Sequence, residues 1–124
     1  EVTATHIISV TVPVKLVSEA NSHEHWRNRQ RRAKLQRSMA KTALGADVKG
    51  PPPPYVITIT RIGPRTLDSD NLAGSAKAVR DGVADWLGID DGDKRLTWEY
   101  AQRSDGAGVY ACEVMIAADM VAPE

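Results

Sequence analysis

The chain has no phenylalanine and only one cysteine among its 124 residues. A single cysteine excludes an internal disulfide and is typical of a reducing compartment, so we expect the protein to be cytoplasmic. Cys112 falls on the apolar face of an alternating segment, so we expect it to be a core residue. Without phenylalanine, the core must be built from Val, Ile, Leu, Ala, Met, Trp and Tyr. The length predicts a single domain over residues 1–124, with a core modest enough for pairing with a second copy to add stability.

The sequence also lacks the patterns of several common sites. The three histidines, His6, His23 and His25, have no spacing that suits zinc. No glycine-rich phosphate loop and no serine or cysteine triad signature is present, and no apolar run approaches the length that crosses a bilayer. A calcium loop starting at Asp68 or Asp91 would lack its terminal acid. The remaining candidates for a functional site are the acidic and basic residues.

The formal net charge is zero, but charge is separated along the chain. Residues 20–45 contain seven basic side chains against one acid, whereas residues 66–93 contain seven acids against two basic side chains. Two such segments can simply attract each other in the fold. The same division is what a metal-dependent nuclease requires, because a basic surface binds the polyanion while an acidic pocket holds the ions.

Alternating apolar residues predict four strands. The first covers residues 6–14, where Pro13 indicates a strand that lies at a sheet edge or ends there. The second covers residues 55–62. Residues 96–100 and 110–116 alternate on either side of a turn, and we interpret them as an antiparallel hairpin.

Helical spacing of apolar residues predicts two helices between these strands. The first runs from about Ser22 to Leu44, with Asn21 and Glu24 as its capping pair. Its thin apolar stripe is made by Leu35, Met39 and Ala43. The second starts near Asn71 and ends at Gly88, with Leu72, Ala76, Val79, Val83 and Trp86 facing the sheet. The resulting order is β-α-β-α-β-β, an α+β domain with a mixed or antiparallel sheet and helices packed against it.

Acidic residues gather where the second helix begins and again where it ends. Asp68 and Asp70 point to the same side if the chain there is extended, and the loop containing Asp90 and Asp91 could return to the same edge of the sheet. Clustered carboxylates repel one another unless a cation lies between them. Mg²⁺, with Mn²⁺ as the alternative ion, takes oxygen ligands and leaves positions open for phosphate, so the pattern predicts a site for phosphodiester hydrolysis. Lys77 follows on the same helix and could approach the charge that develops in the transition state.

Each of these residues also has a simpler interpretation. Asp70 or Asn71 could be only a helix cap, and the segment from Asp90 to Asp93 could be an ordinary Asp-Gly turn. Lys77 could be a surface lysine paired with Asp81 one helical turn later. Only the three-dimensional arrangement distinguishes these interpretations from a shared site.

The run from Arg65 to Leu72, RTLDSDNL, followed by a helix with Lys77 and Arg80 and then by the segment from Gly88 to Asp91, resembles the RusA family of Holliday junction resolvases, which is common in prophages. The resemblance implies a homodimeric, Mg²⁺-dependent endodeoxyribonuclease that acts in DNA recombination and repair. It makes symmetric cuts in four-way DNA junctions inside a bacterial or phage-infected cell. Two identical sites related by a two-fold axis supply the two symmetric nicks.

By position, Asp68, Asp70 and Asp91 match the essential metal-binding acids of that family, and Asp90 matches the acid beside the last of them. The best-known members carry a catalytic lysine four residues after the second aspartate, where this chain has Gly74. We therefore assign that role to Lys77. The residues expected to contact DNA phosphates are Arg27, Arg31, Arg32, Lys34 and Arg65. The alternative function is a catalytically silent protein that binds junctions or branched DNA on the same scaffold.

Overall fold

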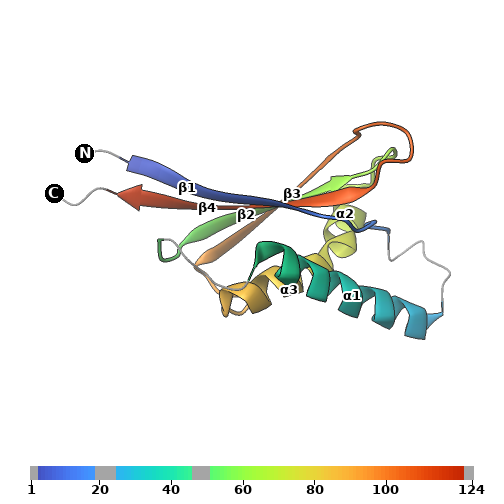
Figure 1. The fold of residues 1–124 in the computed structure, drawn as a ribbon, viewed down its shortest axis with the longest axis horizontal. Coiled ribbons are helices and arrows are strands. Elements are labelled where there is room, and N and C mark those ends of the chain that lie inside the picture. The colour runs from blue at the N-terminus through green and yellow to red at the C-terminus, as the bar shows by residue number, and fades with distance from the viewer. Residues whose placement is uncertain (1–2, 19–24, 46–50, 122–124) are drawn as a thin grey trace.

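Four strands and three helices make up the part of the chain that the computed structural model describes, which is residues 3–18, 25–45 and 51–121 (Figure 1). In chain order they are β1 (Thr3–Val12), α1 (Trp26–Leu44), β2 (Tyr55–Ile62), α2 (Ser69–Ser75), α3 (Lys77–Leu87), β3 (Leu96–Arg103) and β4 (Ala111–Val121). The expected α+β class is confirmed, with helices against one face of a mixed sheet.

The strand order in the sheet is β1-β4-β2-β3. β4 pairs antiparallel with both β1 and β2, whereas β3 pairs in parallel with β2 from Tyr55↔Leu96 to Ile62↔Arg103. The predicted antiparallel hairpin of β3 and β4 is therefore wrong. The crossover through α2 and α3 returns β3 to the edge of the sheet beside β2, and β4 then crosses to the centre. β1 lies at the other edge and ends before Pro13, as that proline predicted.

One face of the sheet forms the core with the helices. Ile57 on β2 lies opposite Ile116 on β4, which in turn lies opposite Ile8 on β1, so apolar side chains line up across the strands. Cys112 belongs to this core and is fully buried, and burial raises the pKa of its thiol to about 12. Its predicted core role is confirmed. The other face carries Val56, which is 39% exposed.

The buried face of α1 differs in part from the predicted apolar stripe. The helix begins at Trp26, where His25 accepts a hydrogen bond from the Arg27 N–H, and the predicted capping pair Asn21 and Glu24 lies outside the described residues. Its buried residues are Gln36 and Ala40, while Leu35 is 60% exposed and does not belong to the apolar stripe. No helix in the described ranges has the length and apolar character that a membrane crossing requires.

The second predicted helix is two helices, α2 and α3, which meet at Ala76. The Ser75 hydroxyl donates a 2.7 Å hydrogen bond to the Leu72 carbonyl, and such back-bonding beside a glycine such as Gly74 commonly bends a helix. The expected buried positions Leu72, Ala76, Val79, Val83 and Trp86 are confirmed. Gly88 ends α3 at φ 68°, a left-handed conformation that favours glycine.

Helices α1 and α3 are joined at their surface by the ion pair of Arg37 and Asp85, whose Nε and Oδ2 atoms lie 2.5 Å apart. The hydrogen bond and charge of Arg37 lower the pKa of the Asp85 carboxyl, although burial opposes this shift. A carboxyl with a lowered folded-state pKa stabilises the fold above its unfolded pKa of about 4, and this contribution is lost as the pH falls through the folded value.

We expect Asp85→Asn to have a shallower loss of stability between about pH 5 and pH 2.5 than the wild type, because the titrating partner of Arg37 is gone. Urea midpoints measured across that range test this expectation. Asp105→Asn is the control, since it removes an exposed carboxylate that pairs with Arg103 in the β3–β4 turn and does not join α1 to α3. Identical pH profiles for Asp85→Asn and the wild type would contradict the prediction.

Candidate functional site

The acidic motif begins where α2 starts. Asp68 is the N-cap of α2, because its Oδ1 accepts a 2.9 Å hydrogen bond from the Asn71 N–H and its Oδ2 accepts one from the Asn71 side chain. The cap is therefore Asp68, not Asp70 or Asn71. Asp70 lies in the first turn, is exposed, and has no hydrogen-bond or ion-pair partner among the described residues. Capping thus explains Asp68, whereas Asp70 contributes only its charge to the start of α2 and binds no other side chain among the described residues.

Two buried or half-buried side chains hold the segment that leads into this motif. The Gln102 amide donates to the Leu67 carbonyl at 2.7 Å and accepts from the Leu67 N–H at 2.9 Å. Arg61, which is 6% exposed, donates to the carbonyls of Leu16 and Arg65. These bonds fix the backbone immediately before Asp68 to β2 and β3.

The second acidic segment is held by α3 and β3. Arg80 Nε donates to Asp91 Oδ2 at 2.9 Å, and Arg80 also bonds the Asp91 carbonyl and the Tyr100 hydroxyl. The guanidinium lies 4.7 Å from the centre of the Trp98 ring, whose Nε1 donates to the same carbonyl at 2.8 Å. Lys77 completes the arrangement, with Nζ 3.5 Å from Asp91 Oδ2. Asp91 is thus fixed through both its backbone and its carboxylate.

The charges of this cluster follow from its contacts. Burial acts to raise the pKa of Asp91, but the charges of Lys77 and Arg80 and their hydrogen bonds outweigh it and lower that pKa. The pKa of Lys77 is raised, chiefly by its hydrogen bond to Asp81 at 2.6 Å and against the effect of burial. Lys77 is therefore a cation at neutral pH, suited to stabilise negative charge and unsuited to act as a general base.

The simpler interpretations are partly correct. Lys77 pairs with Asp81 as a surface lysine would, but it also contacts Asp91. Asp90 forms a turn in which its Oδ2 accepts from the Gly92 N–H at 3.0 Å. Lys77 was expected on one continuous helix with Asp70, but it is the first residue of α3, so the break at Ala76 sets its direction.

The predicted metal ligands are of the kind that Mg²⁺ prefers, but they are not gathered around one point. The described residues contain no group of three or more His, Cys, Asp or Glu side chains arranged to hold a metal ion. Trp98 and Gln102, which contact the two acidic segments, are four positions apart on β3, or roughly 13 Å at the rise of a strand. A cation at Asp91 would replace Arg80 and Lys77 as its partners. The shared ion stays a prediction.

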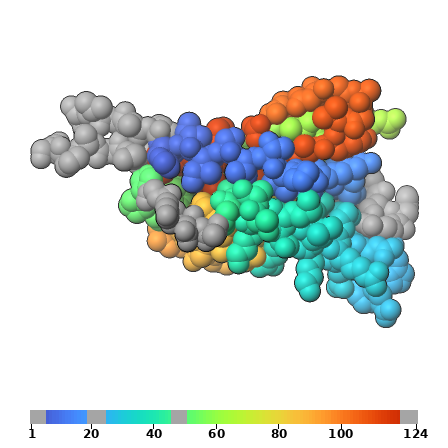
Figure 2. Space-filling model, viewed as in Figure 1, coloured from blue at the N-terminus to red at the C-terminus, as the bar shows by residue number. Residues whose placement is uncertain are grey.

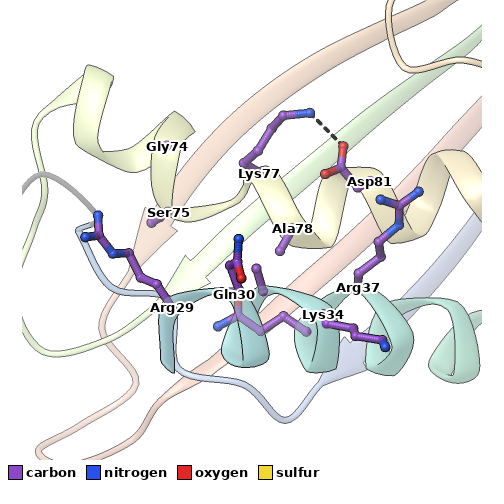
Figure 3. A pocket seen from close by; sticks show the side chains of 11 residues that line it. Arg29, Gln30, Lys34, Arg37, Gly74, Ser75, Lys77, Ala78 and Asp81 are labelled. Atoms are coloured by element: carbon purple, nitrogen blue, oxygen red, sulfur yellow. Dashed lines mark hydrogen bonds and ion pairs between the residues drawn. The ribbon is translucent and has the colours of Figure 1, made fainter. Parts of the chain in front are cut away.

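A cleft of about 460 Å³ lies between α1 and the α2–α3 pair (Figure 3). The side chains of Arg29, Gln30 and Arg37 rise from α1 toward it, and Lys77 borders it from α3. Gly74 lies on the α2 side, and a Cβ added there would meet no atom within 4 Å. The cleft therefore has cationic side chains on both walls and free space beside Gly74.

The residues expected to contact DNA are distributed over two places. Arg27, Arg31 and Lys34 are exposed on α1, whose N-terminal end stands out from the body (Figure 2), and Arg32 on the same helix is half-buried with interactions of its own. Arg65 is exposed in the turn before the acidic motif, with its carbonyl bonded to Arg61. Four of the five thus lie on one helix.

Sequence reasoning missed the side chains that support the acids. Trp98, Tyr100 and Gln102 share the helix-covered face of β3 with Leu96 and alternate with exposed residues, a pattern that the sequence displays. Their partners were not readable, because those contacts depend on the parallel pairing of β3 with β2.

No protein-family model matches the chain, and a search of curated proteins found no match. The resemblance to junction resolvases therefore stands on the acidic motifs and their order alone.

Proposed function

We propose that the protein is a Mg²⁺-dependent endonuclease that resolves four-way DNA junctions as a homodimer. The observation that carries this proposal is the contact of Lys77 with Asp91. The two residues were assigned to one active site from different motifs of the sequence, and Nζ of Lys77, at the start of α3, lies 3.5 Å from Oδ2 of Asp91, in the loop after that helix. A lone surface lysine would gain little from a second carboxylate, since exposed ion pairs contribute under about 1 kcal/mol.

Three side chains of the protein would have separate roles in cleavage. Lys77 neutralises negative charge on the phosphate that is cut, and Arg80 positions Asp91 through its carboxylate and carbonyl. Gln102 holds the backbone that presents Asp68 and Asp70. Mg²⁺, when bound to these acids, would activate water and stabilise the leaving oxygen.

The polyanion would be bound by the exposed basic residues of α1. Contacts from Arg27, Arg31 and Lys34 to phosphates fix position and carry little sequence information, so binding should weaken steeply with salt.

For the dimer interface, we favour the face of the sheet that the helices leave uncovered. Ile7, 54% exposed, and Val56 both lie opposite Ala117 in the register, so apolar residues are adjacent across three strands.

One observation favours the second candidate, a catalytically silent protein that binds branched DNA. Arg80 holds Asp91 through both its carboxylate and its carbonyl, so this acid is neutralised without a metal ion. Labelled synthetic four-way junctions, compared with matched linear duplex in Mg²⁺ and in chelator, distinguish the two. Paired cuts that require Mg²⁺ support the endonuclease, whereas binding without cuts supports the silent protein.

We expect Lys77→Ala to slow junction cleavage by roughly 100-fold, the usual effect of removing one group that stabilises transition-state charge. Adding Gly74→Lys to this variant should restore part of the rate, because the position has open space and lies where the family lysine is found. Single-turnover cleavage rates measure both effects. Lys41→Ala, which removes a lysine from the last turn of α1, is the control. Wild-type cleavage by Lys77→Ala would remove Lys77 from the active site.

A further inference from the structure

An exposed aromatic group lies at the start of α1, beside the basic side chains. Trp26 is 52% exposed, its ring stacks with that of His25 at a centroid separation of 5.7 Å, and the Arg27 guanidinium lies 5.3 Å from its centre. A tryptophan at this position contributes nothing to the core. Aromatic and guanidinium groups of this kind bind the faces of nucleic-acid bases.

A surface hollow of about 350 Å³ adjoins this tryptophan. We call it the outer hollow, and it is lined by Trp26, Arg27, Gln30, Arg31 and Lys34. Gln30 and Lys34 also line the cleft between α1 and the α2–α3 pair, so the outer hollow and the cleft are neighbours along α1. Together they form a path from an exposed indole to Lys77.

The chemistry of this path changes along its length. The outer hollow has one aromatic group and three cations, whereas the cleft has Ala33, Ala78 and Gly74 among its lining residues. Cations stand at the border of the cleft, and its one acid, Asp81, is paired with Lys77. Nε of Arg29, on the cleft wall, is buried and lacks a hydrogen-bond partner among the described residues. The cleft volume is within the range of small-molecule sites and suits one nucleotide. A chain of phosphates with flat apolar groups between them matches both parts.

We propose that α1 carries a binding track for an unpaired nucleic-acid strand. Trp26 stacks on one base, Arg31 and Lys34 contact the neighbouring phosphates, and the next nucleotide lies in the cleft toward Lys77. Duplex DNA hides the faces of its bases, so Trp26 gains contact only with an unpaired strand. The inference rests on DNA being the substrate, as in the proposed function, and extends that substrate to junctions or forks with a single-stranded arm.

The test measures binding without cleavage. The full chain is titrated in chelator with a fluorescent 12-nucleotide oligothymidylate and, separately, with a duplex of equal length. We expect Trp26→Ala to weaken single-strand binding about tenfold, the effect of losing one base stack, and duplex binding by less than twofold. Trp26→Phe should retain most of the single-strand affinity. Leu35→Ala, another exposed apolar residue of α1 outside the track, is the matched control and should bind like the wild type.

A second variant tests the cleft separately. Gly74→Leu adds a side chain where the structure has open space, so the fold should persist while the cleft is filled. We expect it to weaken single-strand binding several-fold and to leave circular dichroism unchanged. Single-strand affinity that is unaltered in both Trp26→Ala and Gly74→Leu would overturn the track, even if junctions are cleaved. Equal competition by an acidic peptide would overturn it too. Single-strand binding by a protein that cuts no junction would support the track and refute the proposed nuclease.

Discussion

Asp70→Asn is expected to reduce junction cleavage by at least about 100-fold while folding and junction binding persist. The substitution keeps the shape of the side chain and removes the charge that a Mg²⁺ ligand requires. Asp70 is exposed and has no partner among the described residues, so its loss breaks no hydrogen bond or ion pair. A decrease in activity would then report chemistry at the metal site.

The experiment compares single-turnover cleavage, junction affinity in chelator, and thermal unfolding. Asp105→Asn is the control, because it makes the same change at an exposed acid in the β3–β4 turn, where it removes only the ion pair with Arg103. Asp91→Asn is less informative, since it would also disturb Arg80 and Lys77. Cleavage by Asp70→Asn at the wild-type rate would show that Asp70 is no ligand.

The largest stability effect is expected at Gly82, where α1 and α3 cross. A Cβ added to Gly82 would collide with the Arg37 carbonyl oxygen and would lie 2.9 Å from the Ala40 Cβ. Both the helix backbone and a fully buried alanine resist displacement. We expect Gly82→Ala to lower the free energy of unfolding by about 1–3 kcal/mol, the usual cost of overpacking, despite the better helix propensity of alanine.

Gly74→Ala provides the matched comparison, because it places the same methyl group on α2 with no atom within 4 Å. We expect it to stabilise the protein by about 0.5–1 kcal/mol through helix propensity and reduced chain entropy. Urea unfolding measures the free energy of unfolding of both variants. Because both replace a helical glycine with alanine, the effect of helix propensity largely cancels from the difference between them. Equal changes in the two variants would contradict the close helix crossing.

Local patterns predicted most of the elements correctly. The alternation in β1 and β2, the helical spacing from Leu72 to Trp86 and the glycine stop at Gly88 are all found in the structure. Each of these depends on the side chains of a single segment and on a repeat of two or 3.6 residues. Leu35 was assigned wrongly because the apolar stripe of α1 is thin, so that the packing of α3 near Gly82, and not hydropathy, selects the buried face.

The sequence by itself determined the α+β class, the apolar face of each strand, the burial of Cys112 and the position of Asp68 at a helix start. Only the tertiary structure decided that β3 pairs in parallel with β2, that the second helix breaks at Ala76, and that Arg80 and Lys77 meet Asp91. These features depend on contacts between segments distant in the chain. Strand pairing and side-chain partnership carry no local period that a sequence can display.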